Sequence, residues 1–298
     1  MSTAGAEQQA SAEVFDLGYQ HYTGQRHGRL GSFLAIYTDG IRAATGLGRG
    51  VSQKLLAGLF VLLGMAPAVF IVIIAGAATS FGADRSEIDL PRHPDYYEFS
   101  WIILFLFAAA VAPALLCPDR RNSVLTLYAV RPITMTDYVF ARWAAFLTVA
   151  LVFVYAPQLL LLVAFALSAD SPVTYVSDNW LDVPRIIASG GGIALLMTGI
   201  AMAAASFTTR RPLASVSVIG LLIIMSAVGG FGNALLDGDL QDWAGLLILP
   251  DVSAMLVGWI FGSGGSFDLS PWIYTGWIAV LIAGATALMW WRYRRLST

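Results

Sequence analysis

Six long runs of apolar residues divide the chain, and none of them contains a Lys, Arg, Asp or Glu. Each run is close to the roughly 20 residues that a helix rising about 1.5 Å per residue needs to cross about 30 Å of hydrocarbon. The pattern therefore predicts an all-α, polytopic membrane protein with six transmembrane helices. The predicted spans cover about residues 55–76, 99–117, 144–167, 186–207, 214–235 and 273–291, which together form one transmembrane domain over 55–291.

A different periodicity precedes the first span. Apolar residues at Leu30, Phe33, Leu34 and Tyr37 follow the three-and-four spacing of one helical face. This spacing predicts an amphipathic interfacial helix over residues 30–48 that lies along the inner membrane surface. A simple membrane anchor fits the same pattern equally well. Residues 1–29 would form a cytoplasmic N-terminal segment.

The loop between the second and third spans also has a helical, amphipathic middle. Val124, Leu125 and Tyr128 share one face by their spacing, and Pro132 should end the helix after Arg131. Asp119 would stand near the N-terminal end of this loop helix, where the helix dipole favours an anion. The apolar face could bind a partner, or it could rest on lipid or on the chain's own bundle. Thr134 or Thr136 could cap the third span.

Residues 243–262 are apolar but are interrupted by Pro250 and Asp251. Each half is too short to span the membrane, and a single crossing would place Asp251 in its middle. We therefore predict a re-entrant pair of short helices on the outer side, before the sixth span.

The charges between the apolar runs predict the orientation. Only Arg85, Arg92 and Arg185 of the 17 basic residues lie on the side that we assign to the outside, whereas acidic residues concentrate there. Short loops rich in Lys and Arg stay in the cytoplasm, so both termini should be cytoplasmic. Lys54 is the only lysine among the 17 basic residues. Such a preference for arginine over lysine is typical of GC-rich bacterial genomes. The expected location is a bacterial cytoplasmic membrane.

Small and polar residues within the spans suggest how the helices pack. Residues 189–192, Gly199 and residues 229–232 permit close approach, either inside the bundle or at a dimer seam. Gln158 is one of the few strongly polar groups at depth. We expect it to form a hydrogen bond between helices.

The chain carries little chemistry of its own. The predicted spans have no charged group for an ion-coupled carrier, and His21, His27 and His93 all fall in predicted loops. A single cysteine, Cys117, excludes an intrachain disulfide and leaves no cysteine metal cluster. Lys54 follows Gln53, so the Gly-Lys pair of a phosphate-binding loop is missing. We therefore expect no enzyme activity, metal or cofactor in this chain, and an uphill pump would need ATP hydrolysed by a partner.

Residues 119–142 carry a resemblance to a known family. The stretch from Asp119-Arg120-Arg121 through Thr126-Leu127 to Arg131-Pro132-Ile133-Thr134 is similar to the acidic-x-basic, Thr-Leu, Arg-Pro-Ile-Ser/Thr loop of ABC-2 type permeases. These are the transmembrane subunits of one class of ATP-binding-cassette exporter. The chain departs from the family pattern around that Thr-Leu pair, which leaves its choice of ATPase open.

The resemblance implies a permease that moves an unidentified substrate. Its partners would be an ABC ATPase subunit that binds ATP and Mg²⁺, a second copy of the chain or a paralogous permease, and the lipid bilayer, with no nucleic acid. A non-pumping scaffold or sensor subunit and an ion-coupled carrier are the alternatives. The residues that the resemblance assigns to the ATPase-coupling interface are Asp119, Arg120, Arg121, Val124, Leu125, Tyr128 and Arg131.

Overall fold

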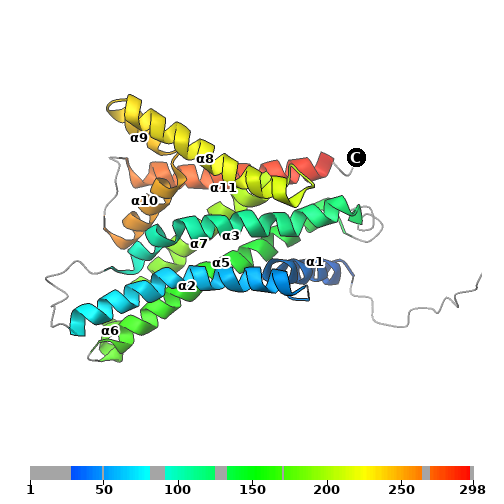
Figure 1. Cartoon of the computed structure of the whole chain (residues 1–298). Coiled ribbons are helices and arrows are strands. Elements are labelled where there is room, and N and C mark those ends of the chain that lie inside the picture. Colours follow the sequence, from blue (N-terminus) through cyan, green and yellow to red (C-terminus); the bar gives the residue numbers. More distant parts are fainter. Residues whose placement is uncertain are drawn as a thin grey trace, which may run out of the picture.

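The computed structural model describes residues 28–48, 50–80, 91–124, 133–169, 171–263 and 269–295, and every regular element in these ranges is a helix. Most of the predicted N-terminal segment (1–29) and the loop residues 125–132 lie outside the described residues. The helices are α1 Gly28–Thr45, α2 Val51–Ser80, α3 His93–Arg121, α5 Met135–Leu167, α6 Pro172–Asp178, α7 Asp182–Ala205, α8 Arg211–Leu235, α9 Asp239–Gly245, α10 Leu249–Phe261 and α11 Pro271–Arg295 (Figure 1).

Six of these helices, α2, α3, α5, α7, α8 and α11, are long and apolar enough to cross a membrane. They coincide with the six predicted spans, which confirms a multi-pass helical architecture. The helices α3 and α5 extend beyond the predicted spans, because capping residues rather than hydropathy set their ends. Thr134 caps α5, with Asp137 completing the capping box, and Asp95 accepts from the backbone N–H of Arg92 ahead of α3.

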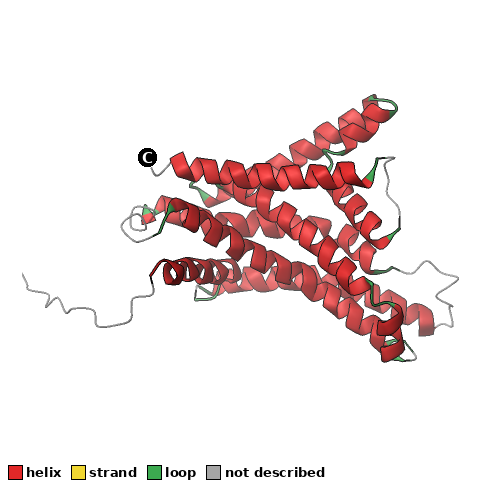
Figure 2. Cartoon of the chain, turned by 180° about the vertical axis from the view of Figure 1, so that it is seen from behind, coloured by secondary structure: helices red, strands yellow, loops and turns green. Residues whose placement is uncertain are grey.

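The helices α3, α5 and α7 form the packed centre, whereas α2, α8 and α11 expose most of their apolar surface. Figures 1 and 2 show that α1 lies beside α5 at the end of the bundle where α3 and α11 finish and α5 begins. We call this the basic end, since it carries Arg29, Arg120, Arg142 and Arg292. The helices α6, α9 and α10 lie at the opposite end (Figure 1).

Glycines allow the helices to approach closely, as predicted. A Cβ at Gly190 of α7 would lie 2.6 Å from the Tyr155 ring of α5, and one at Gly192 would lie 2.8 Å from Leu256 of α10. At Gly199 the backbone of Ile282 on α11 would be 3.5 Å away. These residues therefore serve packing inside one chain.

The predicted hydrogen bond of Gln158 is confirmed, and its partner corrects another prediction. Gln158 Nε2 donates to the backbone oxygen of His93 (3.0 Å), and its Oε1 lies 2.8 Å from His93 Nδ1. The placement of His93 in a loop was wrong, because the residue begins α3 and is buried. Pro94, which suits a first helical turn, starts the helix before the apolar run.

The predicted division of residues 243–262 was also misplaced. Pro250 lies in the first turn of α10, and the break falls earlier, between α9 and α10. Proline lacks a backbone N–H and is tolerated in a first turn, so it starts this helix instead of splitting one. The helix α10 packs against α3, α7 and α11.

Two adjacent glycines of α8 provide a test of this packing. A Cβ at Gly229 would meet Ile248 at 2.7 Å and the backbone oxygen of Ala244 at 3.0 Å, whereas one at Gly230 would meet no atom within 4 Å. Gly229→Ala should lower the free energy of unfolding by about 1–3 kcal/mol through overpacking. Gly230→Ala should stabilise α8 by up to about 1 kcal/mol. Equal effects of the two substitutions in a reversible unfolding titration would contradict the packing.

Candidate functional site

The candidate site is a cluster of charged side chains at the basic end, built around Arg142 of α5. The side chain of Arg142 is only 2% exposed. Its Nη2 lies 2.6 Å from Asp119 Oδ2 and 2.8 Å from Asp39 Oδ2, and its Nε donates to Asp119 over 3.1 Å. Tyr138 also donates its hydroxyl to Asp119 Oδ2 (2.8 Å). One guanidinium thus joins α1, α3 and α5.

The guanidinium charge of Arg142 is costly to bury, and the groups around it offset this cost. Removing an ion from water costs several kcal/mol unless opposite charges and hydrogen bonds replace the water. Here two carboxylates face one guanidinium, and Asp119 is 14% exposed while Asp39 is 60% exposed. Asp119 is therefore the buried partner, and Asp39 is the link from α1 at the surface.

Close packing holds α1 against α5 beside this ion pair. A Cβ at Gly40 would lie 2.6 Å from Ala145 Cβ and 3.4 Å from Arg142 Nη1, so only glycine fits this position. Tyr37 and Thr148 share a hydrogen bond of 2.9 Å between their hydroxyls. Ile36 of α1 is buried in the hydrophobic core. One face of α1 therefore packs on its own chain, and it includes Ile36, Gly40 and Ala43.

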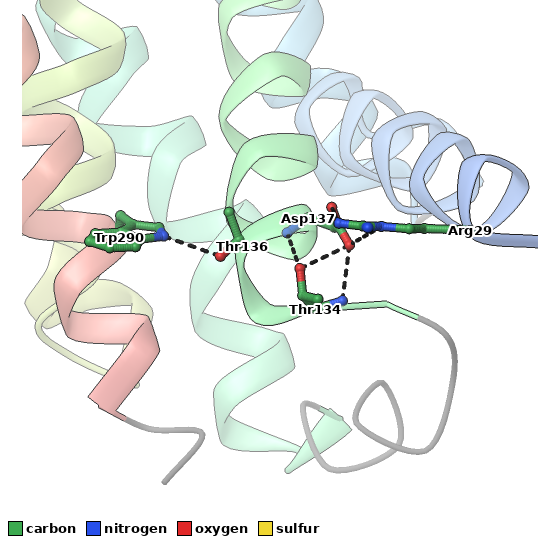
Figure 3. A network of polar contacts seen from close by, with 5 residues as sticks. All are labelled: Arg29, Thr134, Thr136, Asp137 and Trp290. Atoms are coloured by element: carbon green, nitrogen blue, oxygen red, sulfur yellow. Dashed lines mark hydrogen bonds and ion pairs between the residues drawn. The ribbon is translucent and has the colours of Figure 1, made fainter.

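A second group of polar contacts surrounds the first turn of α5, as Figure 3 shows. Arg29 of α1 donates to both carboxylate oxygens of Asp137, over 2.9 and 2.7 Å. Because Asp137 accepts these hydrogen bonds, the pKa of the Arg29 guanidinium is raised. Trp290 of α11 donates its indole N–H to Thr136 (3.2 Å). The residues that follow the loop are thus tied to both α1 and α11.

The last turn of α3 is tied to the turn between α7 and α8. Arg120 donates to the backbone oxygen of Ser206, and its guanidinium lies 5.9 Å from the centre of the Tyr293 ring. Arg292 of α11 donates to the same oxygen over 3.1 Å. Two arginines from different helices therefore bind one carbonyl, which joins α3, α7 and α11 at the basic end.

The residues predicted for the ATPase-coupling interface do not all lie in one kind of environment. The placement of Asp119 at the start of a loop helix was wrong, because α3 continues through Pro118 to Arg121. Asp119 and Arg120 contact their own chain, whereas Arg121 is exposed and Val124 is half-buried just beyond the helix. Leu125, Tyr128 and Arg131 lie outside the described residues, so their role stays a prediction.

The central residues of the cluster escaped the sequence reasoning. The sequence pattern assigns no role to Asp39, and it places residue 142 only at the end of the family-like stretch 119–142. One signal was available: Tyr138, Arg142 and Ala145 follow a capped helix start at i, i+4 and i+7, and so share one face. The pairing with Asp39 and Asp119 needs the tertiary fold, which no local pattern encodes.

The chemistry of the cluster indicates a mechanical role. Arginine stays protonated and its planar guanidinium can join two carboxylates at once, whereas it is a poor nucleophile or general base. Over the described ranges, no group of His, Cys, Asp and Glu could hold a metal ion. The arrangement can hold three helices in one geometry.

No family model matches the chain, and no curated protein matches its sequence.

Arg142→Gln tests the ion-pair cluster. The substitution leaves the buried Asp119 without its counter-charge, so the free energy of unfolding should fall by about 3–5 kcal/mol. Arg42→Gln, on the exposed side of α1, is the matched control and should stay within about 0.5 kcal/mol of wild type. A reversible denaturation titration of the purified protein measures both, and equal losses would contradict a structural role for Arg142.

Gly40→Ala tests the contact between α1 and α5. The added methyl collides with Ala145, and the resulting strain of about 1–3 kcal/mol should open the contact. Trypsin should then cleave at Arg29 and Arg42 roughly tenfold faster, since about 1.4 kcal/mol corresponds to tenfold in the open population. Thr38→Ala, at an exposed position of the same helix, should cleave at the wild-type rate; equal rates for both variants would show that α1 does not depend on this contact.

Proposed function

We propose that the chain is the transmembrane permease subunit of an ABC-type exporter of the ABC-2 class. It would move an unidentified substrate across a bacterial cytoplasmic membrane with ATP hydrolysed by a separate nucleotide-binding subunit. The observation that carries this proposal is the cluster around Arg142. It joins α1 to the two helices that flank residues 125–132, so a force on that segment would reach three helices at once.

The membrane helices support a transport role that depends on another subunit. The six apolar helices provide the spans, and the sequence contains no Gly-Lys pair for binding nucleotide phosphates. The acidic and basic groups of α5, Asp137 and Arg142, are paired at its first turns, far from the middle of the helix. An ion-coupled carrier needs titratable groups deeper in the bundle.

The finer topology belongs to the same proposal. By the positive-inside rule the basic end faces the cytoplasm, and both termini lie there. The helix α1 would lie at the inner membrane surface, with its polar side to water. At the opposite end, α9 and α10 would form the re-entrant pair, in which α10 packs against α3, α7 and α11 and α9 packs against α8.

The movement of the ATPase would act on the segment that follows α3. Arg121 and Val124, with Leu125, Tyr128 and Arg131, would contact the ATPase, while Asp119 and Arg120 would pass the movement to the bundle. Closure of two ATPase subunits would then rotate two permease copies as rigid bodies between inward-facing and outward-facing or closed states.

Coexpression with an ATPase encoded beside this gene tests the proposal. The two proteins should co-purify and show vanadate-sensitive ATP hydrolysis. Tyr128→Asp or Arg131→Glu should lower that activity about tenfold, because an interface residue of this kind contributes about 1–2 kcal/mol or more. Arg185→Glu, at the opposite end of the bundle, is the control and should keep it.

Three results would contradict the proposal in whole or in part. Lack of a co-purifying ATPase, together with function that survives deletion of residues 124–131, would favour a scaffold or sensor subunit. Transport abolished by an ionophore in ATP-replete vesicles would favour an ion-coupled carrier. Unchanged ATP hydrolysis in both loop variants would show that coupling does not pass through this segment.

A further inference from the structure

A cavity of about 610 Å³ lies among α1, α2, α3 and α5 near the basic end. Three aromatic rings line it, those of Phe60, Phe107 and Phe153. Phe107 and Phe153 are stacked with their centres 4.4 Å apart, and Phe60 meets Phe107 edge-on at 5.9 Å. Pockets that bind small ligands fall in the range of about 300–1,000 Å³ and are lined mainly by such apolar groups. The cavity can therefore hold a hydrocarbon chain.

The cavity opens on the side that a membrane would cover. Val61 of α2 and Val152 of α5 line it and are 58% and 63% exposed, and Leu56 is exposed as well. These helices are two of the six candidate spans, so the opening lies on an apolar surface. A ligand would enter sideways from the bilayer, which favours an acyl chain over a water-soluble molecule.

Among the residues that the structure describes, the charged ones that line this cavity are two cations, Lys54 and Arg211. Both stand in the first turn of a helix, α2 and α8, where the helix dipole disfavours a positive charge. An anion beside these residues would lower this cost and would also meet the partial positive charge of the helix ends. Basic pockets between transmembrane helices on the cytoplasmic side are typical binding sites for anionic headgroups.

We infer that this cavity binds an anionic phospholipid, with an acyl chain against the three phenylalanine rings and the headgroup at Lys54 and Arg211. A zwitterionic lipid would fill the apolar part but would have no net charge for the cations. A free anion would meet the cations but would leave the apolar part empty. Residues 43–47 at the end of α1 line the same cavity, so the lipid would also contact the helix that Arg142 holds. The inference is independent of transport.

Native mass spectrometry of the purified protein tests whether the two cations select an anionic lipid. In detergent with equimolar dioleoylphosphatidylglycerol and dioleoylphosphatidylcholine, the wild type should retain the anionic lipid roughly tenfold or more over the zwitterionic one. Each basic residue near a headgroup contributes about 1 kcal/mol, which corresponds to about fivefold. The double variant Lys54→Gln and Arg211→Gln should bind both lipids equally, whereas Arg42→Gln, at the same end but outside the cavity, should keep the preference.

A second variant tests the cavity without changing its charge. Gly58 lines the cavity, and a Cβ there would meet no atom within 4 Å, so Gly58→Leu adds bulk from a position where the backbone has room for a side chain. It should reduce retention of both lipids severalfold. Gly284→Leu on α11, which is equally free of close neighbours and lies outside the cavity, should leave retention unchanged.

Three outcomes would overturn the inference. The wild type could retain the two lipids equally, or the preference could survive loss of both cations. Inorganic phosphate at millimolar concentration could displace the lipid, which would identify a site for free anions instead. Because no ATPase is present, these results leave the proposed function untouched, and loss of ATPase coupling leaves the lipid preference untouched.

Discussion

The buried guanidinium of Arg142 is the interaction on which the basic end depends. An arginine shielded from water must keep its counter-charges, so Asp119 on α3 and Asp39 on α1 cannot move away from α5 without a large cost. Gly40 and Ala145 meet beside this cluster so closely that residue 40 has no room for a Cβ. The positions of α1, α3 and α5 are therefore linked by charge and by shape together.

The packing of the other helices follows from the apolar lipid that would surround them. Because lipid is as apolar as the side chains of the spans, helices associate by close packing and not by hydrophobic burial. Glycines of α7 meet this need against α5, α10 and α11, and the pair His93 and Gln158 adds a hydrogen bond at the opposite end. The peripheral helices α2 and α8 keep exposed apolar surface, and part of that surface frames the cavity for which we propose an anionic lipid.

The spans, the cap at Thr134 and the role of Gln158 could be predicted from the sequence, since each depends on a local physical demand. A helix must be apolar for about 30 Å, its first turn needs acceptors, and a polar group at depth needs a partner. The cluster around Arg142 could not be predicted, because its members come from three helices and Asp39 is far from the other two in the chain. Asp119 and His93 were misplaced for a related reason: hydropathy marks where a span is apolar, whereas capping and tertiary contacts decide where its helix ends.

The most direct test of this account is the distance between α1 and the end of α3, measured by pulsed electron paramagnetic resonance in nanodiscs. Spin labels at the exposed positions Leu30 and Arg121, in a Cys117→Ser background, report the two helices that Arg142 joins. We predict one narrow distance in the otherwise wild-type protein and a broad distribution after Arg142→Gln. A broad distribution in both proteins, or a narrow one that survives Arg142→Gln, would show that Arg142 does not hold α1 to the bundle.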